Sequence, residues 1–219
     1  MEPITVLIAE DHTLVREGTR QVLEQEPDLR VVGEAESGDR AVALARSLLP
    51  NVVLLDVRLP VLNGIDAARR LRKILPSARL IFVTMHAGAD YVGEAFRAGA
   101  MGYILKRAAA SELLTAIHAV LKGNHYVSPL VTRNALDLLI SSSKPGGKFQ
   151  DRLTPRQREV LQLVAEGRSR KEIARILNIT VKTVEFHKGK LMHELNLQTV
   201  ADFTRYAIEH GIIPAERSS

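Results

Sequence analysis

Short apolar segments alternate with amphipathic segments through the first 122 residues, and this alternation constrains the fold more than any other feature of the chain. The segments expected to form strands are residues 5–9, 31–35, 52–55, 80–84 and 102–105. Residues 52–55 are apolar at every position, as is typical of a strand that helices cover on both faces of a parallel sheet. The pattern therefore predicts an α/β fold, a doubly wound (βα)5 sheet.

The remaining segments indicate a second, smaller domain. Helices are expected at residues 13–24, 39–48, 64–75, 91–98 and 111–122, and again at residues 155–166, 170–177, 181–195 and 199–209. Between these groups lie a short helical segment near residues 130–140 and a Ser-, Pro- and Gly-rich stretch at 141–147. We expect a first domain at residues 1–122, a linker at 123–150 and an all-α four-helix domain at 151–215. A chain of 219 residues is long enough for two domains, because compact domains most often have about 100 to 150 residues.

The composition excludes several classes of protein. The chain has no cysteine, which excludes a disulfide scaffold, a thiolate zinc site and cysteine catalysis. No apolar run approaches the roughly 20 residues of a membrane span, and the first residues lack the basic and apolar regions of a secretion signal. We therefore expect a cytoplasmic protein that does not enter a membrane.

Polar side chains stand at the carboxyl ends of four predicted strands, where an open α/β sheet binds its ligands. They are Glu10, Asp11, Asp56, Thr84 and Lys106. Carboxylates gathered at one end of a sheet repel one another unless a cation joins them, and an all-oxygen ligand set suits Mg²⁺. We therefore expect Glu10, Asp11 and Asp56 to hold Mg²⁺.

The same residues have the parts needed for in-line capture of a phosphoryl group. Asp56 would attack the phosphorus, Mg²⁺ and Lys106 would neutralise the phosphoryl oxygens, and Thr84 would donate a hydrogen bond. The product would be an aspartyl phosphate. Any one of these residues alone is more often a turn or helix-cap residue, so the prediction depends on their joint placement.

Several stretches of the first domain carry a family resemblance. They are residues 8–12 (Ile-Ala-Glu-Asp-His), 55–60 (Leu-Asp-Val-Arg-Leu-Pro), 63–64 (Asn-Gly), 83–85 (Val-Thr-Met) and 99–106 (Gly-Ala-Met-Gly-Tyr-Ile-Leu-Lys). With them, residues 1 to 122 resemble the receiver domain of two-component response regulators. The resemblance implies that a sensor histidine kinase phosphorylates Asp56, with Glu10 and Asp11 helping to hold Mg²⁺. It also implies that Tyr103 is a switch residue, whose ring turns inward as Thr84 moves toward the phosphate.

Two residues depart from the family pattern. Glu10 replaces the commoner Asp, and its extra methylene leaves both direct and water-mediated contact with the cation open. Met85 stands where a smaller residue is usual, beside the phosphate entrance. A bulky side chain there predicts restricted access for water and slow loss of the phosphoryl group.

A concentration of positive charge in the second domain predicts a surface that faces DNA phosphates. Residues 168–190 hold two acids and the bases Arg168, Arg170, Lys171, Arg175, Lys182, Lys188 and Lys190. A merely solvated helix surface is the alternative interpretation of such a cluster. The segments 170–177 and 181–195, joined by a turn at Asn178 and Ile179, have the spacing of a helix-turn-helix, with Thr180 as N-cap of the second helix.

A helical wheel separates the two faces of the second of these helices. Val181, Val184, Leu191 and Leu195 share one stripe, which we expect to be buried. The opposite face is polar and basic, as is typical of a DNA-reading surface. His187 lies at the edge of the stripe, and we favour a scaffold role for it over a phosphate contact.

The outward face supplies the expected DNA contacts. We expect Glu185 to accept a hydrogen bond from a cytosine amino group and Phe186 to touch a thymine methyl group, while Gly189 lets a backbone approach closely. The residues expected to contact phosphates are Arg170, Lys171, Lys182, Thr183 and Lys190.

The second domain carries a resemblance of its own at residues 153–161, 166–167, 172–174 and 183–187. These stretches are similar to the helix-turn-helix DNA-binding domain of the LuxR type, and with the first domain they resemble a response regulator of the NarL/FixJ class. The resemblance implies that the final helix, residues 199–209, pairs two chains as a homodimer on a two-fold DNA site.

Together these features predict a transcription regulator whose phosphorylation on Asp56 controls dimerisation, domain release and promoter binding. We expect no turnover enzyme, although the resemblance allows the chain to catalyse its own dephosphorylation. One alternative is a phosphorylation-independent DNA-binding regulator with a degenerate docking domain. Another is an aspartate-dependent phosphatase, against which Arg58 stands where a second acid is usual.

Overall fold

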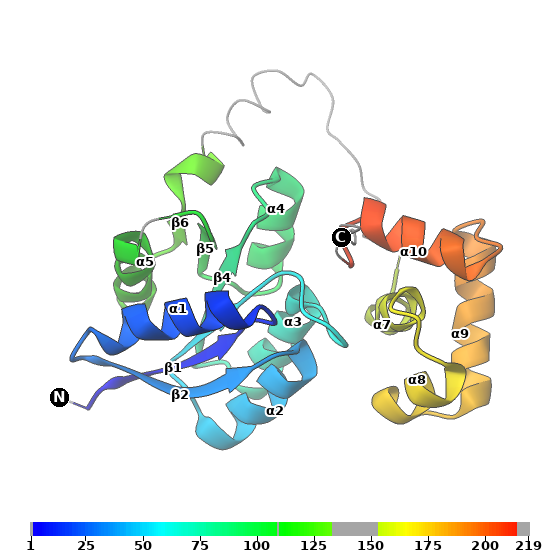
Figure 1. Ribbon diagram of the computed structural model, residues 1–219, viewed down its shortest axis with the longest axis horizontal. Coiled ribbons are helices and arrows are strands. Elements are labelled where there is room, and N and C mark those ends of the chain that lie inside the picture. The colour runs from blue at the N-terminus through cyan, green and yellow to red at the C-terminus, as the bar shows by residue number, and fades with distance from the viewer. Residues whose placement is uncertain (1, 109, 133–152, 214–219) are drawn as a thin grey trace. The chain divides into compact units, whose positions relative to one another are not determined.

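The computed structural model describes residues 2–108, 110–132 and 153–213 (Figure 1). The chain divides into two compact units, Met1–Pro145 and Gly146–Ser219. The first unit is built around a β-sheet, and the described part of the second is helical. The predicted α/β fold followed by an all-α domain is confirmed.

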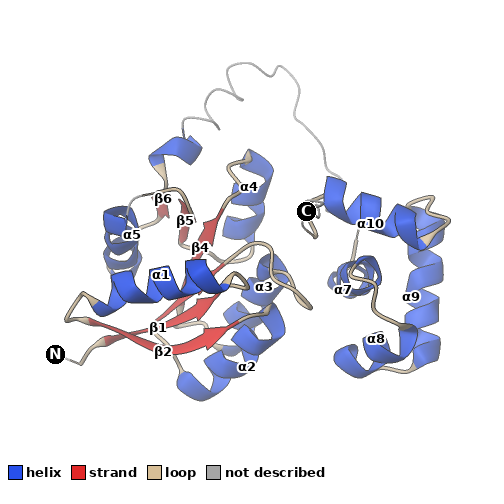
Figure 2. Ribbon diagram, viewed as in Figure 1, coloured by secondary structure: helices blue, strands red, loops and turns tan. Residues whose placement is uncertain are grey.

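A parallel sheet forms the centre of the first unit (Figure 2). Its strands are β1 (Ile4–Ala9), β2 (Leu29–Ala35), β3 (Val52–Leu55), β4 (Arg79–Thr84), β5 (Gly102–Leu105) and β6 (Tyr126–Val127). They pair in the order β2-β1-β3-β4-β5-β6, and every pairing is parallel. The chain passes from one side of β1 to the other, so a topological switch point, where ligands bind in such sheets, lies between β1 and β3.

Helices cover both faces of this sheet. They are α1 (Thr13–Glu24), α2 (Gly38–Leu48), α3 (Gly64–Ile74), α4 (Ala89–Arg97) and α5 (Ala110–Leu121). On one face, α1 and α5 contribute Leu23 and Ile117 to a buried cluster. On the other face, α2, α3 and α4 contribute Ala41, Leu71 and Ala95. Because successive strand residues point to opposite faces, a strand covered on both sides is apolar throughout, as 52–55 predicted.

The strand β6 differs from the prediction, which assigned its residues to the linker. Tyr126 lies opposite Gly102 in a parallel pairing with β5, so the sheet continues past residue 122. A strand of two residues has too few positions to show an alternating pattern, and its partner lies elsewhere in the sequence. Of the expected helix at 130–140, residues 133–140 lie outside the described residues, as does most of the expected linker.

The described part of the second unit consists of four helices, α7 (Pro155–Ala165), α8 (Arg170–Leu177), α9 (Val181–Glu194) and α10 (Val200–Glu209). Each begins after a hydroxyl-bearing N-cap whose side chain accepts a hydrogen bond from a main-chain N–H three residues on. Leu161, Ile173, Leu191 and Phe203, one from each helix, are buried. Among the described helices, none combines the length and the apolar character needed to cross a membrane.

Candidate functional site

An acidic pocket lies beyond the carboxyl ends of β1, β3 and β5. Glu10 and Asp56 are buried, with 4% and 6% of their surfaces exposed, whereas Asp11 is exposed. The Lys106 ammonium joins the two buried acids, since Nζ lies 2.6 Å from Glu10 Oε2 and 2.7 Å from Asp56 Oδ2. The structure thus brings together Glu10, Asp56 and Lys106, which the sequence placed at three separate strand ends.

The main chain around Asp56 is held tightly. Its N–H donates to the Ala9 carbonyl at 3.0 Å, which ties the end of β3 to the end of β1. Gly64, the first residue of α3, donates to the Val57 carbonyl at 2.9 Å. A Cβ on Gly64 would overlap the Asp56 carbonyl oxygen, so this close approach requires glycine.

Burial and charge set the protonation of the pocket. Burial raises the pKa of the Glu10 carboxyl above its usual value, and the charge of Asp56 adds to this while the hydrogen bond from Lys106 opposes it. Burial would lower the pKa of Lys106, but the charge of Asp56 and the hydrogen bonds to Asp56 and Glu10 prevail and raise it. The lysine therefore remains charged at neutral pH and compensates the two carboxylates.

The carboxylates also form a candidate divalent-cation site. One ligand atom from each of Glu10, Asp11, His12 and Asp56 lies within 4.8 Å of the others. Carboxylate oxygens suit a hard cation such as Mg²⁺, so these residues fit the metal expected from the sequence. His12 was missed by the sequence prediction, although it directly follows the two acids. Its Nδ1 lies 2.9 Å from Asp11 Oδ1 and 3.0 Å from Glu10 Oε1.

Thr84 and Tyr103 lie on adjacent strands beside the pocket. Thr84 ends β4 and is fully buried, and its Oγ1 accepts a 3.4 Å hydrogen bond from the His86 N–H. The Tyr103 ring is also fully buried, and its hydroxyl donates to the His86 carbonyl at 2.7 Å. The Tyr103 ring therefore lies inside the unit, where a main-chain carbonyl accepts the hydrogen bond of its hydroxyl, and its role as a switch stays a prediction. Met85, which lies between Thr84 and His86 in the chain, is 67% exposed.

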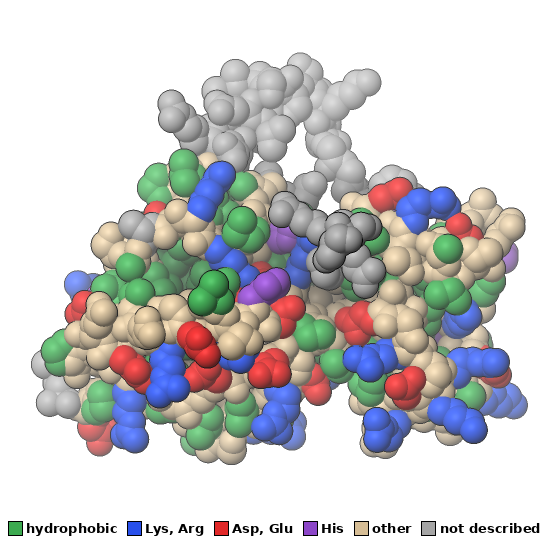
Figure 3. Space-filling view, viewed as in Figure 1, with side chains coloured by type: hydrophobic (Ala, Val, Ile, Leu, Met, Phe, Trp, Pro, Cys, Tyr) green, Lys and Arg blue, Asp and Glu red, His purple; other side chains and the backbone are tan. Residues whose placement is uncertain are grey.

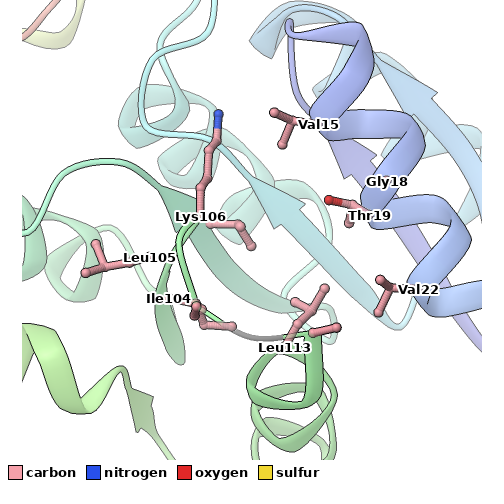
Figure 4. A pocket seen from close by; sticks show the side chains of 11 residues that line it. Val15, Gly18, Thr19, Val22, Ile104, Leu105, Lys106 and Leu113 are labelled. Atoms are coloured by element: carbon pink, nitrogen blue, oxygen red, sulfur yellow. The ribbon is translucent and has the colours of Figure 1, made fainter.

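A largely apolar cavity of about 360 Å³ adjoins the acidic pocket, because Lys106 is among its lining residues. Val15, Gly18, Thr19 and Val22 of α1 line one side of it (Figure 4). The rest of the cavity is lined by residues of β4, β5 and α5 and by the segment between β5 and α5. Lys106 belongs to that segment. Lys106 thus belongs to both the acidic pocket and this cavity.

The helix-turn-helix of the second unit is formed by α8 and α9. Val184 and Leu191 are buried, as predicted, whereas Leu195, also expected in the buried stripe, is only half-buried. Val181 is 38% exposed, which corrects its placement in the buried stripe. It is the first residue of α9, directly after the Thr180 cap, whereas the buried stripe residues Val184 and Leu191 lie further along the helix.

The expected DNA contacts are mostly accessible. Phe186 is 67% exposed, and Lys171, Lys182, Gly189 and Lys190 are exposed as well. Figure 3 shows Lys and Arg side chains gathered over α8 and α9. Thr183 is half-buried, with Oγ1 2.8 Å from Thr180 Oγ1.

Arg170 and Glu185, which were predicted to have separate roles, form an ion pair. Arg170 Nη1 donates to Glu185 Oε1 at 2.5 Å, joining the start of α8 to the exposed face of α9. His187 is half-buried, and its Nδ1 has no hydrogen-bond partner among the described residues. Burial and the charge of Arg156 lower the pKa of this imidazole.

Two known protein families match the chain, one in each unit. Residues 6–118 match the response regulator receiver domain, and residues 151–207 match the bacterial regulatory proteins of the luxR family. The chain is a two-component response regulator of the NarL/FixJ class. A response regulator of this architecture is a DNA-binding transcription regulator and not a turnover enzyme.

Similar proteins share both domains of this response regulator. It is 40% identical over 210 residues to the transcriptional regulatory protein MctR of Rhizobium johnstonii, covering 96% of this chain and 95% of that one. It is 34% identical over 198 residues to the nitrate/nitrite response regulator protein NarL of Escherichia coli K12, covering 90% and 92%. The solved structure of the response regulator RcsB from Salmonella typhimurium is similar with a TM-score of 0.63 at 29% identity, covering 94% and 97%.

Proposed function

We propose that Asp56 accepts a phosphoryl group from a sensor histidine kinase and that this modification controls promoter binding by the second unit. The observation that carries the proposal is the buried Lys106 bridge between Glu10 and Asp56. A lysine charge compensating one reactive carboxylate and one neighbouring acid is an arrangement suited to phosphoryl transfer.

The proposed reaction forms a bond between a carboxylate oxygen of Asp56 and phosphorus. The bond between phosphorus and the imidazole nitrogen of the kinase breaks, and the imidazole keeps the electron pair. Lys106 is placed to neutralise the oxygens of the transferred group, because its ammonium lies 2.7 Å from Asp56 Oδ2. Glu10, Asp11 and Asp56 would hold Mg²⁺, which when bound neutralises phosphoryl oxygens.

Phosphorylation would change the charge of the pocket and, through Thr84, the hydrogen bonds of the β4–α4 loop. The aspartyl phosphate carries about −1.5 to −2 charges in place of the single negative charge of the carboxylate, so the pocket gains about 0.5 to 1 negative charge and three acceptor oxygens. Thr84 would donate a hydrogen bond to the new oxygens. His86, whose N–H donates to Thr84 Oγ1, is also the hydrogen-bond partner of the Tyr103 hydroxyl. A coupling of about 1 to 3 kcal/mol between this site and dimerisation or domain release is sufficient for a switch.

The second unit supplies the proposed DNA contacts. We assign phosphate contacts to Lys171, Lys182, Thr183 and Lys190 on α8 and α9, and base-edge contacts to the exposed face of α9 that includes Phe186 and Gly189. A complex of the similar response regulator RcsB with DNA, 30% identical to this chain, supports DNA binding by this chain but does not bear on the individual contacts. We propose that this chain binds double-stranded promoter DNA as a homodimer through α10.

Phosphoryl uptake tests the proposal at Asp56. The full chain is incubated with Mg²⁺ and either a phosphorylated histidine kinase or an acyl phosphate, and intact-protein mass spectrometry measures the product. The wild type is expected to gain one phosphoryl group and Asp56→Asn none. Asp39→Asn, which removes an exposed aspartate on α2, is the control and is expected to behave as the wild type. Equal uptake by Asp56→Asn and Asp39→Asn would contradict the proposal.

A further inference from the structure

The main chain of Glu10 is held from two sides. Its N–H donates to the Ala35 carbonyl, at the end of β2, at 2.9 Å. Its carbonyl accepts a 2.7 Å hydrogen bond from Arg16 Nη1, in the second turn of α1. The main chain of Glu10 is therefore fixed to two different elements, independently of the contacts that its side chain makes.

Arg16 is itself fixed in place. Only 7% of its surface is exposed, which is unusual for an arginine within a helix and is expected only where its charge is compensated. Nε lies 3.2 Å from Glu34 Oε2, and Nη2 lies 3.2 Å from Glu36 Oε1. The planar guanidinium thus uses three nitrogens for three partners, two carboxylates and one main-chain carbonyl.

The side chain of Glu10 makes this anchoring important. Glu10 has one more rotatable bond than an aspartate, so the position of its carboxylate is less restricted by its own main chain. The carboxylate meets its partners at both oxygens, with Oε1 accepting from the His12 N–H at 3.1 Å and Oε2 lying 2.6 Å from Lys106 Nζ. A displaced Glu10 backbone would move these oxygens away from Asp56.

We propose that Arg16 is a positioning residue for the cation site, acting through the Glu10 main chain. It contacts neither Asp56 nor Asp11 in any hydrogen bond or ion pair of the described residues, so its effect on the cation passes through Glu10. The functional meaning of the cation rests on the phosphoryl transfer proposed above, whereas cation binding itself can be measured without it. Loss of a residue that orients a metal ligand typically lowers metal affinity by about 10- to 100-fold.

If Arg16 acted on the cation only through its charge, its removal would change the cation affinity in the opposite direction. Removing a positive charge near a cluster of carboxylates strengthens the attraction of that cluster for a cation. Positioning predicts that removal weakens cation binding. The direction of the change therefore separates the two effects.

Arg20 offers a matched control within the same helix. It also contacts Glu34, with Nη1 3.2 Å from Oε1, and it pairs with Glu24 at 2.7 Å. Its guanidinium is half exposed, and within the described residues its ion pairs are with these two acids and not with Glu10. Substitution of Arg20 therefore removes the same charge from the same helix without releasing the Glu10 carbonyl.

The test is Mg²⁺ binding to the unphosphorylated full chain, measured by isothermal titration calorimetry at fixed ionic strength. Arg16→Met is expected to weaken Mg²⁺ binding by about 10-fold or more, and Arg20→Met to leave it unchanged or slightly tighter. Arg16→Lys, which keeps the charge and loses the planar fork, is expected to lie closer to Arg16→Met than to the wild type. Circular dichroism melting reports whether each variant is folded.

Equal or tighter Mg²⁺ binding by Arg16→Met compared with Arg20→Met would overturn the proposal. If Arg16→Met does not fold, the comparison of Arg16→Lys with Arg20→Met decides in the same way. Failure of the proposed function has a different signature, in which the wild type binds Mg²⁺ but takes up no phosphoryl group from any donor. The magnesium concentration for half-maximal phosphorylation gives a second readout and should rise in Arg16→Met.

Discussion

At the scale of single residues, Lys106 is the side chain on which the acidic pocket most depends. Its ammonium compensates two buried carboxylates within 2.7 Å. Without it, Glu10 and Asp56 would face each other as uncompensated buried charges, which is strongly unfavourable. The same charge that stabilises the unphosphorylated pocket can also neutralise the oxygens of a transferred phosphoryl group.

Tyr103 provides a pH-dependent prediction. Burial and the charge of Asp56 raise the pKa of its phenol above the ordinary value of 10.0. The neutral phenol therefore contributes stability that is fully present below the ordinary pKa and is lost as the pH rises above it. Spectrophotometric titration should show one tyrosine that ionises later than the others and is missing in Tyr103→Phe. An unchanged titration curve in that variant would contradict the buried, hydrogen-bonded ring.

Met85 provides a kinetic prediction. Its side chain is large and 67% exposed at the residue after Thr84. If it shields the acyl phosphate from water, Met85→Ala should lose its phosphoryl group faster than the wild type. The half-life of the phosphorylated protein, followed by mass spectrometry after removal of the donor, measures this. Equal half-lives would remove any role of Met85 in protecting the phosphate.

At the scale of elements, the space around two glycines, one in the close packing between β3 and α3 and one in α1, predicts contrasting effects of their substitution by alanine. Gly64→Ala would force a Cβ onto the Asp56 carbonyl oxygen, so it should destabilise the first unit by about 3 kcal/mol or more. Gly18, inside α1, has open space where a Cβ would lie, with no neighbouring heavy atom within 4 Å. Gly18→Ala should therefore stabilise by up to about 1 kcal/mol through helix propensity. Urea unfolding measures both, and a similar loss in both variants would contradict the packing described.

The ion pair between α8 and α9 predicts how Arg170 contributes to DNA binding. If Arg170 orients Glu185, Arg170→Ala should relax the preference at one base position and leave the salt dependence of affinity nearly unchanged. If Arg170 instead contacts a phosphate, the variant should bind all sequences more weakly and reduce the slope of log K against log salt by about 0.9. Binding-site selection and salt titrations on the same DNA distinguish the two results. Lys182→Ala is the matched control for a phosphate contact.

Local sequence patterns predicted the elements well, for a physical reason. The bounds of α1, α8, β3 and β5 coincide with the prediction, because apolar periodicity and capping residues are local signals. The edge strand β6 was missed because its two residues are defined by pairing with a distant strand. The contact of Arg16 with the Glu10 carbonyl and the Arg170–Glu185 ion pair were missed for the same reason, since neither follows from spacing along one helix.

At the scale of the whole molecule, the proposed phosphorylation site and the helix-turn-helix lie in different units. The first unit has a buried acidic pocket at the switch point of its sheet, and the second has a basic, exposed helix-turn-helix. The proposed function requires that a charge placed on Asp56 change the affinity of the second unit for DNA. A coupling of about 1 to 3 kcal/mol corresponds to a change in DNA affinity of about 5- to 150-fold.

The most direct test of this coupling is the dissociation constant for a DNA site selected from genomic fragments, measured with and without phosphodonor at one salt concentration. For the wild type, phosphorylation is expected to tighten binding about 5- to 150-fold, and for Asp56→Asn the donor is expected to have no effect. Tightening of equal size in Asp56→Asn, or a phosphorylated wild type whose DNA affinity is unchanged, would contradict the account.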